Sequence, residues 1–130
     1  MRKPKTPAQK RAQEQKRLKK KCDILWAQIV RDNARGVCEM CGKPGHDAHH
    51  AVSRRQSFLR HSVCNGVYLC CGCHMRLHST EAYTFWTWFA VNRKDDHDFV
   101  IQHKHTLSRN TDYAEVFKRL EGMKELSDEV

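Results

Sequence analysis

Two C-x-x-C pairs constrain the fold of this chain more than any other feature of its sequence. They are formed by Cys38 and Cys41 and by Cys70 and Cys73. A C-x-x-C turn directs two sulfur atoms at one metal ion, and two such turns complete a tetrahedral site of the kind that holds structural zinc. The four thiolates therefore predict a structural Zn²⁺ ion. Cys71 does not match the spacing and is expected to be a spare thiol.

Histidines and one asparagine are interleaved with the cysteines at spacings that favour a second site. They are His49, His50, Asn65, His74 and His78. Successive strand residues point to opposite faces, so one imidazole of the adjacent pair faces a metal and the other faces a substrate phosphate. Residues four apart share one face of a helix, so His74 and His78 are able to bind one ion. Hydrolysis of a phosphate ester uses this division, because it needs an electrophilic metal and a base that activates water.

Other polar residues have more than one interpretation. Asn65 either orients the base imidazole, directly or through the backbone, or is an ordinary turn residue before Gly66. Asp47 is an alternative metal ligand, ranked below His49 because Ala48 separates it from the pair. The remaining histidines are interpreted as surface or core residues, and they are His46, His61, His97, His103 and His105.

The pattern of His49-His50, Asn65 and His74 resembles the HNH nuclease motif, which is built on a ββα-metal fold. With His78 included, the spacing is similar to that of the colicin-type DNases. The resemblance implies that His49, His74 and His78 bind a catalytic divalent ion (Mg²⁺, Mn²⁺, Ni²⁺ or Zn²⁺). It also implies that His50 is the general base and that Asn65 orients it. A four-cysteine zinc site occurs in many other members of this family.

A narrower resemblance covers more of the chain. Leu59-Arg60, Asn65 and the second cysteine pair, in that order, resemble the phage NinG/Rap recombination endonucleases. This implies branched or recombining phage DNA as the substrate. The chain departs from those proteins at His74 and in having two adjacent histidines. The expected function is therefore metal-dependent hydrolysis of DNA phosphodiester bonds. The alternative is a zinc-ribbon DNA-binding protein without catalytic activity, and binding or cleavage of RNA is a third interpretation.

The positive charge of the chain lies at its N-terminus. Residues 1–21 contain ten Lys and Arg and one acidic residue, which equals the net charge of +9, so residues 22–130 are balanced. A basic tail favours a polyanion such as DNA, and its alternative use is as a solubilising arm. The expected DNA contacts are Lys16, Arg17, Lys19, Lys20 and Lys21 in the tail, and Arg54, Arg55 and Arg60 in a loop.

The composition also limits the location and the partners of the chain. No apolar run approaches the length of a membrane span, and no hydrophobic segment follows the basic N-terminus, so neither a membrane partner nor a signal peptide is expected. Seven cysteines, four of them in C-x-x-C pairs, suit a reducing cytoplasm, which is the host cytoplasm if the chain is phage-encoded. Besides DNA, a second copy of the chain or another phage protein remains open as a partner.

The predicted fold is α+β, a small ββα-metal core with structural zinc and helices on both sides. We expect a flexible or helical tail over residues 1–21 and a nuclease domain over residues 22–130. Within that domain we expect a leading helix (22–36), the metal-rich motif (37–79) and a helical part (80–130). The motif is expected to contain strands over 47–52 and 66–69 and a helix that begins near Cys71. The helical part is expected to contain helices over 79–93 and 97–107, the first capped by Ser79 or Thr80. A last helix is expected after a cap at Thr111 or Asp112.

Overall fold

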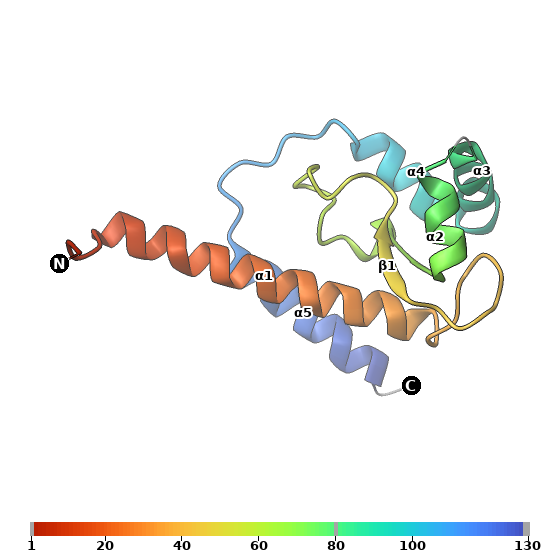
Figure 1. Ribbon diagram of the computed structural model, residues 1–130. Helices are drawn as coiled ribbons and strands as arrows, with labels where there is room; N and C mark the ends of the chain where they lie inside the picture. Colours follow the sequence, from red (N-terminus) through yellow and green to blue (C-terminus); the bar gives the residue numbers. More distant parts are fainter. Residues whose placement is uncertain (1, 80, 129–130) are drawn as a thin grey trace.

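A two-stranded sheet and five α-helices form the described part of the chain, residues 2–79 and 81–128, in a computed structural model (Figure 1). The fold is α+β. The helices are α1 (Pro7–Asn33), α2 (Cys71–Leu77), α3 (Ala82–Asn92), α4 (Lys94–His103) and α5 (Tyr113–Asp128), and the strands are β1 (Asp47–His50) and β2 (Gly66–Leu69). A short 3₁₀ turn, η1 (Val63–Asn65), precedes β2. No helix in these residues is long and apolar enough to cross a membrane.

The two strands form one antiparallel hairpin. Asp47 pairs with Leu69 and His50 with Gly66, and all four residues of β2 are buried. β1 ends at His50 rather than at Val52, which is shorter than expected. The reason is a change of partner, because the Val52 amide donates to the side-chain Oδ1 of Asn65, at 2.7 Å, instead of to a strand carbonyl. Beyond the end of the regular strand pairing, a hydrogen bond to the Asn65 side chain thus still connects the two segments.

Helix α1 runs without interruption from the basic tail into the folded body. Thr6 caps it in a capping box with Gln9, and Pro7 occupies the first turn. The boundary expected after Lys21 lies inside this helix, because Ala, Gln, Glu, Lys and Arg continue its helical composition without a break. Gly36, with φ of +74°, follows the end of the helix, and its N–H donates to the Arg31 carbonyl. The side chains before Gln15 are exposed, and this part of α1 projects beyond the rest of the molecule (Figure 1).

Helix α5 lies alongside α1 and runs in the same direction (Figure 1). At one end, the Tyr113 N–H donates to Gln15 Oε1 at 3.0 Å, and at the other end Lys124 Nζ lies 2.9 Å from a carboxylate oxygen of Asp32. Leu120 is fully buried between the helices. These contacts tie residues 15–21 to the body, although they belong to the basic stretch.

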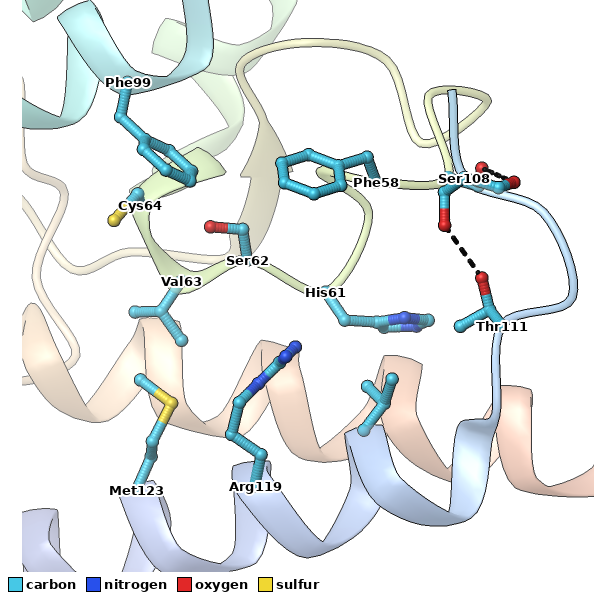
Figure 2. A pocket seen from close by; sticks show the side chains of 12 residues that line it. Phe58, His61, Ser62, Val63, Cys64, Phe99, Ser108, Thr111, Arg119 and Met123 are labelled. Carbon is cyan, nitrogen blue, oxygen red and sulfur yellow. Dashed lines mark hydrogen bonds between the residues drawn. The ribbon is translucent and has the colours of Figure 1, made fainter. Parts of the chain in front are cut away.

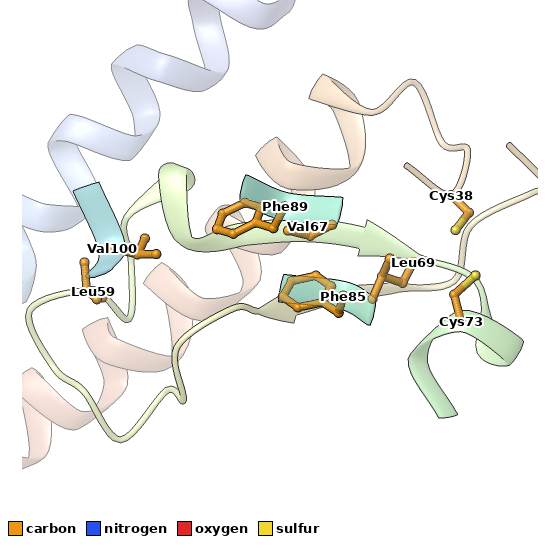
Figure 3. Packing of buried hydrophobic residues seen from close by; sticks show 8 residues of the cluster. All are labelled: Cys38, Leu59, Val67, Leu69, Cys73, Phe85, Phe89 and Val100. Carbon is orange, nitrogen blue, oxygen red and sulfur yellow. The ribbon is translucent and has the colours of Figure 1, made fainter. Parts of the chain in front are cut away.

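The core has two parts, one on each side of the hairpin. One part joins Val67 and Leu69 of β2 to Phe85 and Phe89 of α3. Figure 3 shows these side chains between Cys38 and Cys73 at one end and Leu59 and Val100 at the other. The other part joins β2 to α1 and α5. Phe85 and Phe89 of α3 are almost fully buried and contribute their aromatic rings to the core.

The boundaries of the helices after the hairpin differ from the expected ones. Helix α4 begins at Lys94, because Asp95 and Asp96 provide the negative charge that a first turn favours. It ends at His103, where the amide of Gln56 donates to the carbonyls of His103, Lys104 and Thr106. Helix α3 begins at Ala82 with no side-chain cap, and Thr80 lies outside the described residues.

Candidate functional site

The four paired cysteines come together as the sequence predicts. The sulfur atoms of Cys38, Cys41, Cys70 and Cys73 all lie within 4.8 Å of one another. Cys41 Sγ and Cys70 Sγ are 3.6 Å apart. Two sulfurs bound to one tetrahedral Zn²⁺ at about 2.3 Å would be about 3.8 Å apart, so the spacing fits zinc. Cys71 is exposed and does not belong to the cluster.

Local backbone geometry explains why these thiols converge. Cys38 N–H donates to the Lys43 carbonyl and the Gly42 N–H returns to the Cys38 carbonyl, which closes a tight turn. Gly42 has φ of +76°, a conformation that glycine adopts at little cost. Cys70 caps α2, and the Cys73 N–H donating to its Sγ lowers the pKa of Cys70 to about 6. The chain therefore stabilises a thiolate at this position before any metal binds.

Three histidines gather on one face of β1. The ring of His49 packs 5.1 Å from that of His74 and edge-on to Phe85, and His78 Nε2 lies 3.4 Å from His74 Nε2. Burial lowers the pKa of His49 to about 4, so its imidazole is neutral at pH 7. Neutral imidazole is the form that binds metals. His74 lies in α2 and His78 is the residue that ends it, so the i, i+4 spacing brings their ring nitrogens close together although only His74 is helical.

Asp47 stands behind this cluster. Its Oδ2 lies 3.0 Å from His74 Nδ1, and its Oδ1 lies 3.0 Å from His46 Nδ1. Although burial opposes it, these hydrogen bonds hold the pKa of Asp47 below its ordinary value. A His74 tautomer that donates from Nδ1 keeps the lone pair on Nε2, toward His78. Carboxylates commonly orient metal-binding histidines in this way. Asp47 is therefore placed as a support for His74, a role that the sequence did not reveal.

The histidine set fits a divalent ion in part. Two nitrogens bound to one tetrahedral ion at about 2.05 Å are about 3.3 Å apart, close to the His74–His78 spacing. Among the described residues, however, only the four cysteines form a group of three or more possible ligands with all ligand atoms within 4.8 Å. His49 therefore lies beside the pair without completing a closed set of three.

His50 points to the opposite face of the hairpin, toward α1. Its ring stacks on Trp26 at 3.9 Å with an angle of 9°, and its Nε2 lies 3.0 Å from the carbonyl oxygen of Arg60. A carbonyl only accepts, so Nε2 carries the proton and Nδ1 keeps a lone pair. Burial lowers the pKa of His50, which keeps the ring neutral at pH 7. The ring is thus held in one orientation and in one tautomer.

Asn65 acts on the backbone around His50. The residue is fully buried, its Oδ1 accepts from the Val52 N–H, and its Nδ2 donates to the carbonyls of Val52 and Leu59 at 2.9 and 3.3 Å. No hydrogen bond joins its side chain to the imidazole among the described contacts. Of the two expected routes, the backbone route is the one present, because Asn65 fixes Leu59 next to the carbonyl that accepts from His50.

A charged clamp lies beside His50, and sequence reasoning missed it. Asp23 accepts from Arg60 Nε and Nη2, at 2.9 and 2.8 Å, and lies 2.6 Å from His61 Nε2. Although burial opposes it, these bonds hold the pKa of Asp23 well below its ordinary range. The Arg60 guanidinium, expected to contact phosphate, is thus paired within the protein. The available signal was Asp23 itself, three residues before Trp26 on one helical face.

The other expected DNA-contacting residues remain on the surface. Arg54 and Arg55 are exposed in the loop after β1, and Lys16, Arg17, Lys20 and Lys21 are exposed on α1. Arg17 pairs with Glu14. Lys19 and Lys21 reach over the rings of Tyr113 and Phe117 on α5.

No protein-family model, curated protein or solved structure matches this chain. The case for its function therefore depends on the residues and their geometry.

Proposed function

We propose that this chain is an HNH-type endonuclease that hydrolyses DNA phosphodiester bonds with the help of a divalent ion. The observation that carries the proposal is the division of two adjacent histidines between the faces of β1. His49 joins the imidazole cluster on one face, while His50 is held as a neutral base on the other. A protein that only used zinc to stabilise its fold would need neither the histidine cluster around His49 nor the fixed ring of His50.

His50 has the features of a general base. Its Nδ1 lone pair is the group that takes a proton from the attacking water, because Nε2 is committed to the Arg60 carbonyl. As Nδ1 gains a proton, the imidazolium still donates from Nε2, so the carbonyl stabilises the charged form. Trp26 holds the ring in its plane, and Asn65 and Asp23 hold the backbone that supplies the carbonyl.

The second face would hold the metal. His74 and His78 are the best-placed ligands, His49 is the third candidate, and Asp47 orients His74. When bound there, a divalent ion supplies Lewis-acid stabilisation of the phosphate and of the departing oxygen. The cysteine cluster is separate and would hold structural zinc, which keeps α2 in place, and with it His74 and the C-cap residue His78.

The charge distribution supports DNA as the partner. Residues 1–21 carry the whole excess positive charge and none of the residues proposed for chemistry. They would add affinity that depends on phosphate contacts and therefore falls as the salt concentration rises. On the resemblance described above, the substrate is branched or recombining phage DNA.

Cleavage assays test the proposal directly. Zinc-loaded protein is incubated with supercoiled plasmid and with a Holliday junction in Mg²⁺, Mn²⁺, Ni²⁺ or EDTA. We expect metal-dependent cleavage that His50→Ala reduces about a hundredfold to ten-thousandfold, with DNA binding retained. His105→Ala is the matched control, because His105 is an exposed histidine that contacts neither of the proposed sites.

Metal titration separates the two sites. His74→Ala and His78→Ala should each weaken binding of the catalytic ion and keep one zinc per chain, because the cysteines are untouched. Full cleavage by His50→Ala would remove this residue from the mechanism. Tight DNA binding with no cleavage under any metal would favour the zinc-ribbon DNA-binding protein instead.

A further inference from the structure

A pocket of about 420 Å³ lies next to the proposed base and is not used by the mechanism above (Figure 2). It opens between residues 57–64, helix α4 and helix α5. Phe58, Phe99 and Val116 provide apolar walls, while Ser62 and Thr111 provide hydroxyl groups. This volume is within the range of small-ligand sites, which combine apolar walls with a few polar groups.

Arg119, an exposed residue of α5, adds a positive charge to the lining of the pocket. Its side chain extends from α5 toward the segment that contains His61 and Ser62 (Figure 2). None of the ion pairs among the described residues includes Arg119. Arg60 and Arg93 differ, because each is paired with a carboxylate inside the protein. A guanidinium at an apolar pocket with no partner of its own favours an anionic ligand.

We propose that this pocket binds one nucleotide unit of a DNA strand, with the base against the aromatic walls and the phosphate at Arg119. The aromatic side chains suit the flat face of a base, and Phe58 is 40% exposed and therefore accessible for stacking. The hydroxyl groups of Ser62 and Thr111 suit the polar edge of a base, since each can donate and accept.

The position of the pocket connects it to the site. His61 lines it, and Arg60, the preceding residue, supplies the carbonyl that holds His50. A base that enters the pocket has left the stack of its duplex, which costs least where the base is already unpaired. The inference rests on the proposed function in naming DNA as the ligand, and it specifies substrates with an unpaired nucleotide close to the cut.

The test uses defined probes on residues 1–130 of the chain, loaded with zinc. Deoxyadenosine monophosphate, deoxyadenosine and inorganic phosphate are titrated separately and followed by amide chemical shifts. We expect the monophosphate to shift residues 57–64 and 108–119 and to bind more tightly than either fragment. Arg119→Gln should raise its Kd about tenfold to hundredfold, because a charge-assisted bond is lost. Lys118→Gln is the control, since Lys118 is an exposed cation on the same helix that does not line the pocket.

Cleavage provides the second arm. Arg119→Gln should reduce cutting of DNA with an unpaired nucleotide beside the cut more than cutting of fully paired DNA. Lys118→Gln should leave the cutting of both substrates unchanged. Equal Kd values for the two variants, or shifts caused by phosphate alone, would overturn the pocket proposal even if the protein cleaves DNA. Conversely, specific binding of the monophosphate in a chain that never cleaves would retain the pocket and overturn the proposed function.

Discussion

Replacing Asp23 by Asn should destabilise this protein through one identifiable contact. The Asp23 carboxylate accepts two hydrogen bonds from Arg60 and lies 2.6 Å from His61 Nε2. Asparagine has nearly the same shape, but it offers one oxygen and presents an NH₂ group to donors. The Arg60 side chain is only 18% exposed and His61 only 5%, so water replaces the lost acceptor poorly.

The magnitude follows from this burial. Removing one partner of a fully buried ion pair costs about 3–5 kcal/mol. Asp23 is 33% exposed, so we expect about 2–3 kcal/mol for Asp23→Asn. In a chain of this size, that corresponds to a fall in Tm of about 6–12 °C. Urea and thermal unfolding at pH 7, with zinc saturating, measure it. Asp98→Asn is the control, because the exposed Asp98–Lys94 pair should contribute less than about 1 kcal/mol.

The pH dependence has a defined sign. The folded pKa of Asp23 is depressed, so its contribution is complete above the unfolded pKa of about 3.9 and is lost as the pH falls through the folded value. The gap in stability between wild type and Asp23→Asn should therefore be constant from pH 6 to 8. Equal stability of the two proteins at pH 7 would refute the clamp, and a gap that changed across this range would assign the effect to another titrating group.

Three further perturbations test the zinc, the packing of the sheet and the basic helix. Cys38→Ser should release zinc and lower Tm, since a structural zinc site contributes folding free energy. A zinc analysis that finds no metal in folded wild-type protein would contradict this prediction. Gly66→Ala should destabilise by about 1–3 kcal/mol in urea melts, because its Cβ would lie 2.3 Å from Val30 Cγ2, whereas Gly122→Ala, with nothing within 4 Å, should not. Replacing both Lys10 and Arg11 by Gln should reduce the log–log salt slope of DNA binding by up to about 2 without changing Tm; an unchanged slope would make the arm a solubilising one.

The sequence predicted the parts of this fold that are encoded locally. Strand β2 and the start of α2 lie where expected, because turn residues and cysteine spacing mark their ends. The convergence of four thiols follows from one stereochemical requirement, which is why a four-cysteine cluster able to hold a metal was predictable. The opposite directions of His49 and His50 follow in the same way from the alternation of a strand.

Contacts between distant segments could not be predicted from local patterns. The carboxylate of Asp23 meets Arg60 across 37 positions of the sequence, and Gln15 meets Tyr113 across 98. Nothing near Arg60 distinguishes a paired guanidinium from one free to contact phosphate. The domain boundary expected after residue 21 was inferred from a change in side-chain polarity. The backbone is helical on both sides of that position, so α1 continues through it.

The continuity of α1 has a consequence for the proposed mechanism. The helix runs about 29 Å from its exposed first turn at Pro7 to Trp26, one of the two residues that hold the proposed base in place. Trp26 stacks on His50, and Asp23 fixes the segment whose carbonyl sets the tautomer of His50. A DNA strand bound along the arm would therefore be positioned relative to the base by a single helix, with α5 packed against it. If the chain binds DNA as proposed, the basic stretch would contribute to alignment as well as to affinity, because residues 15–21 are anchored to the body while residues 2–14 are exposed.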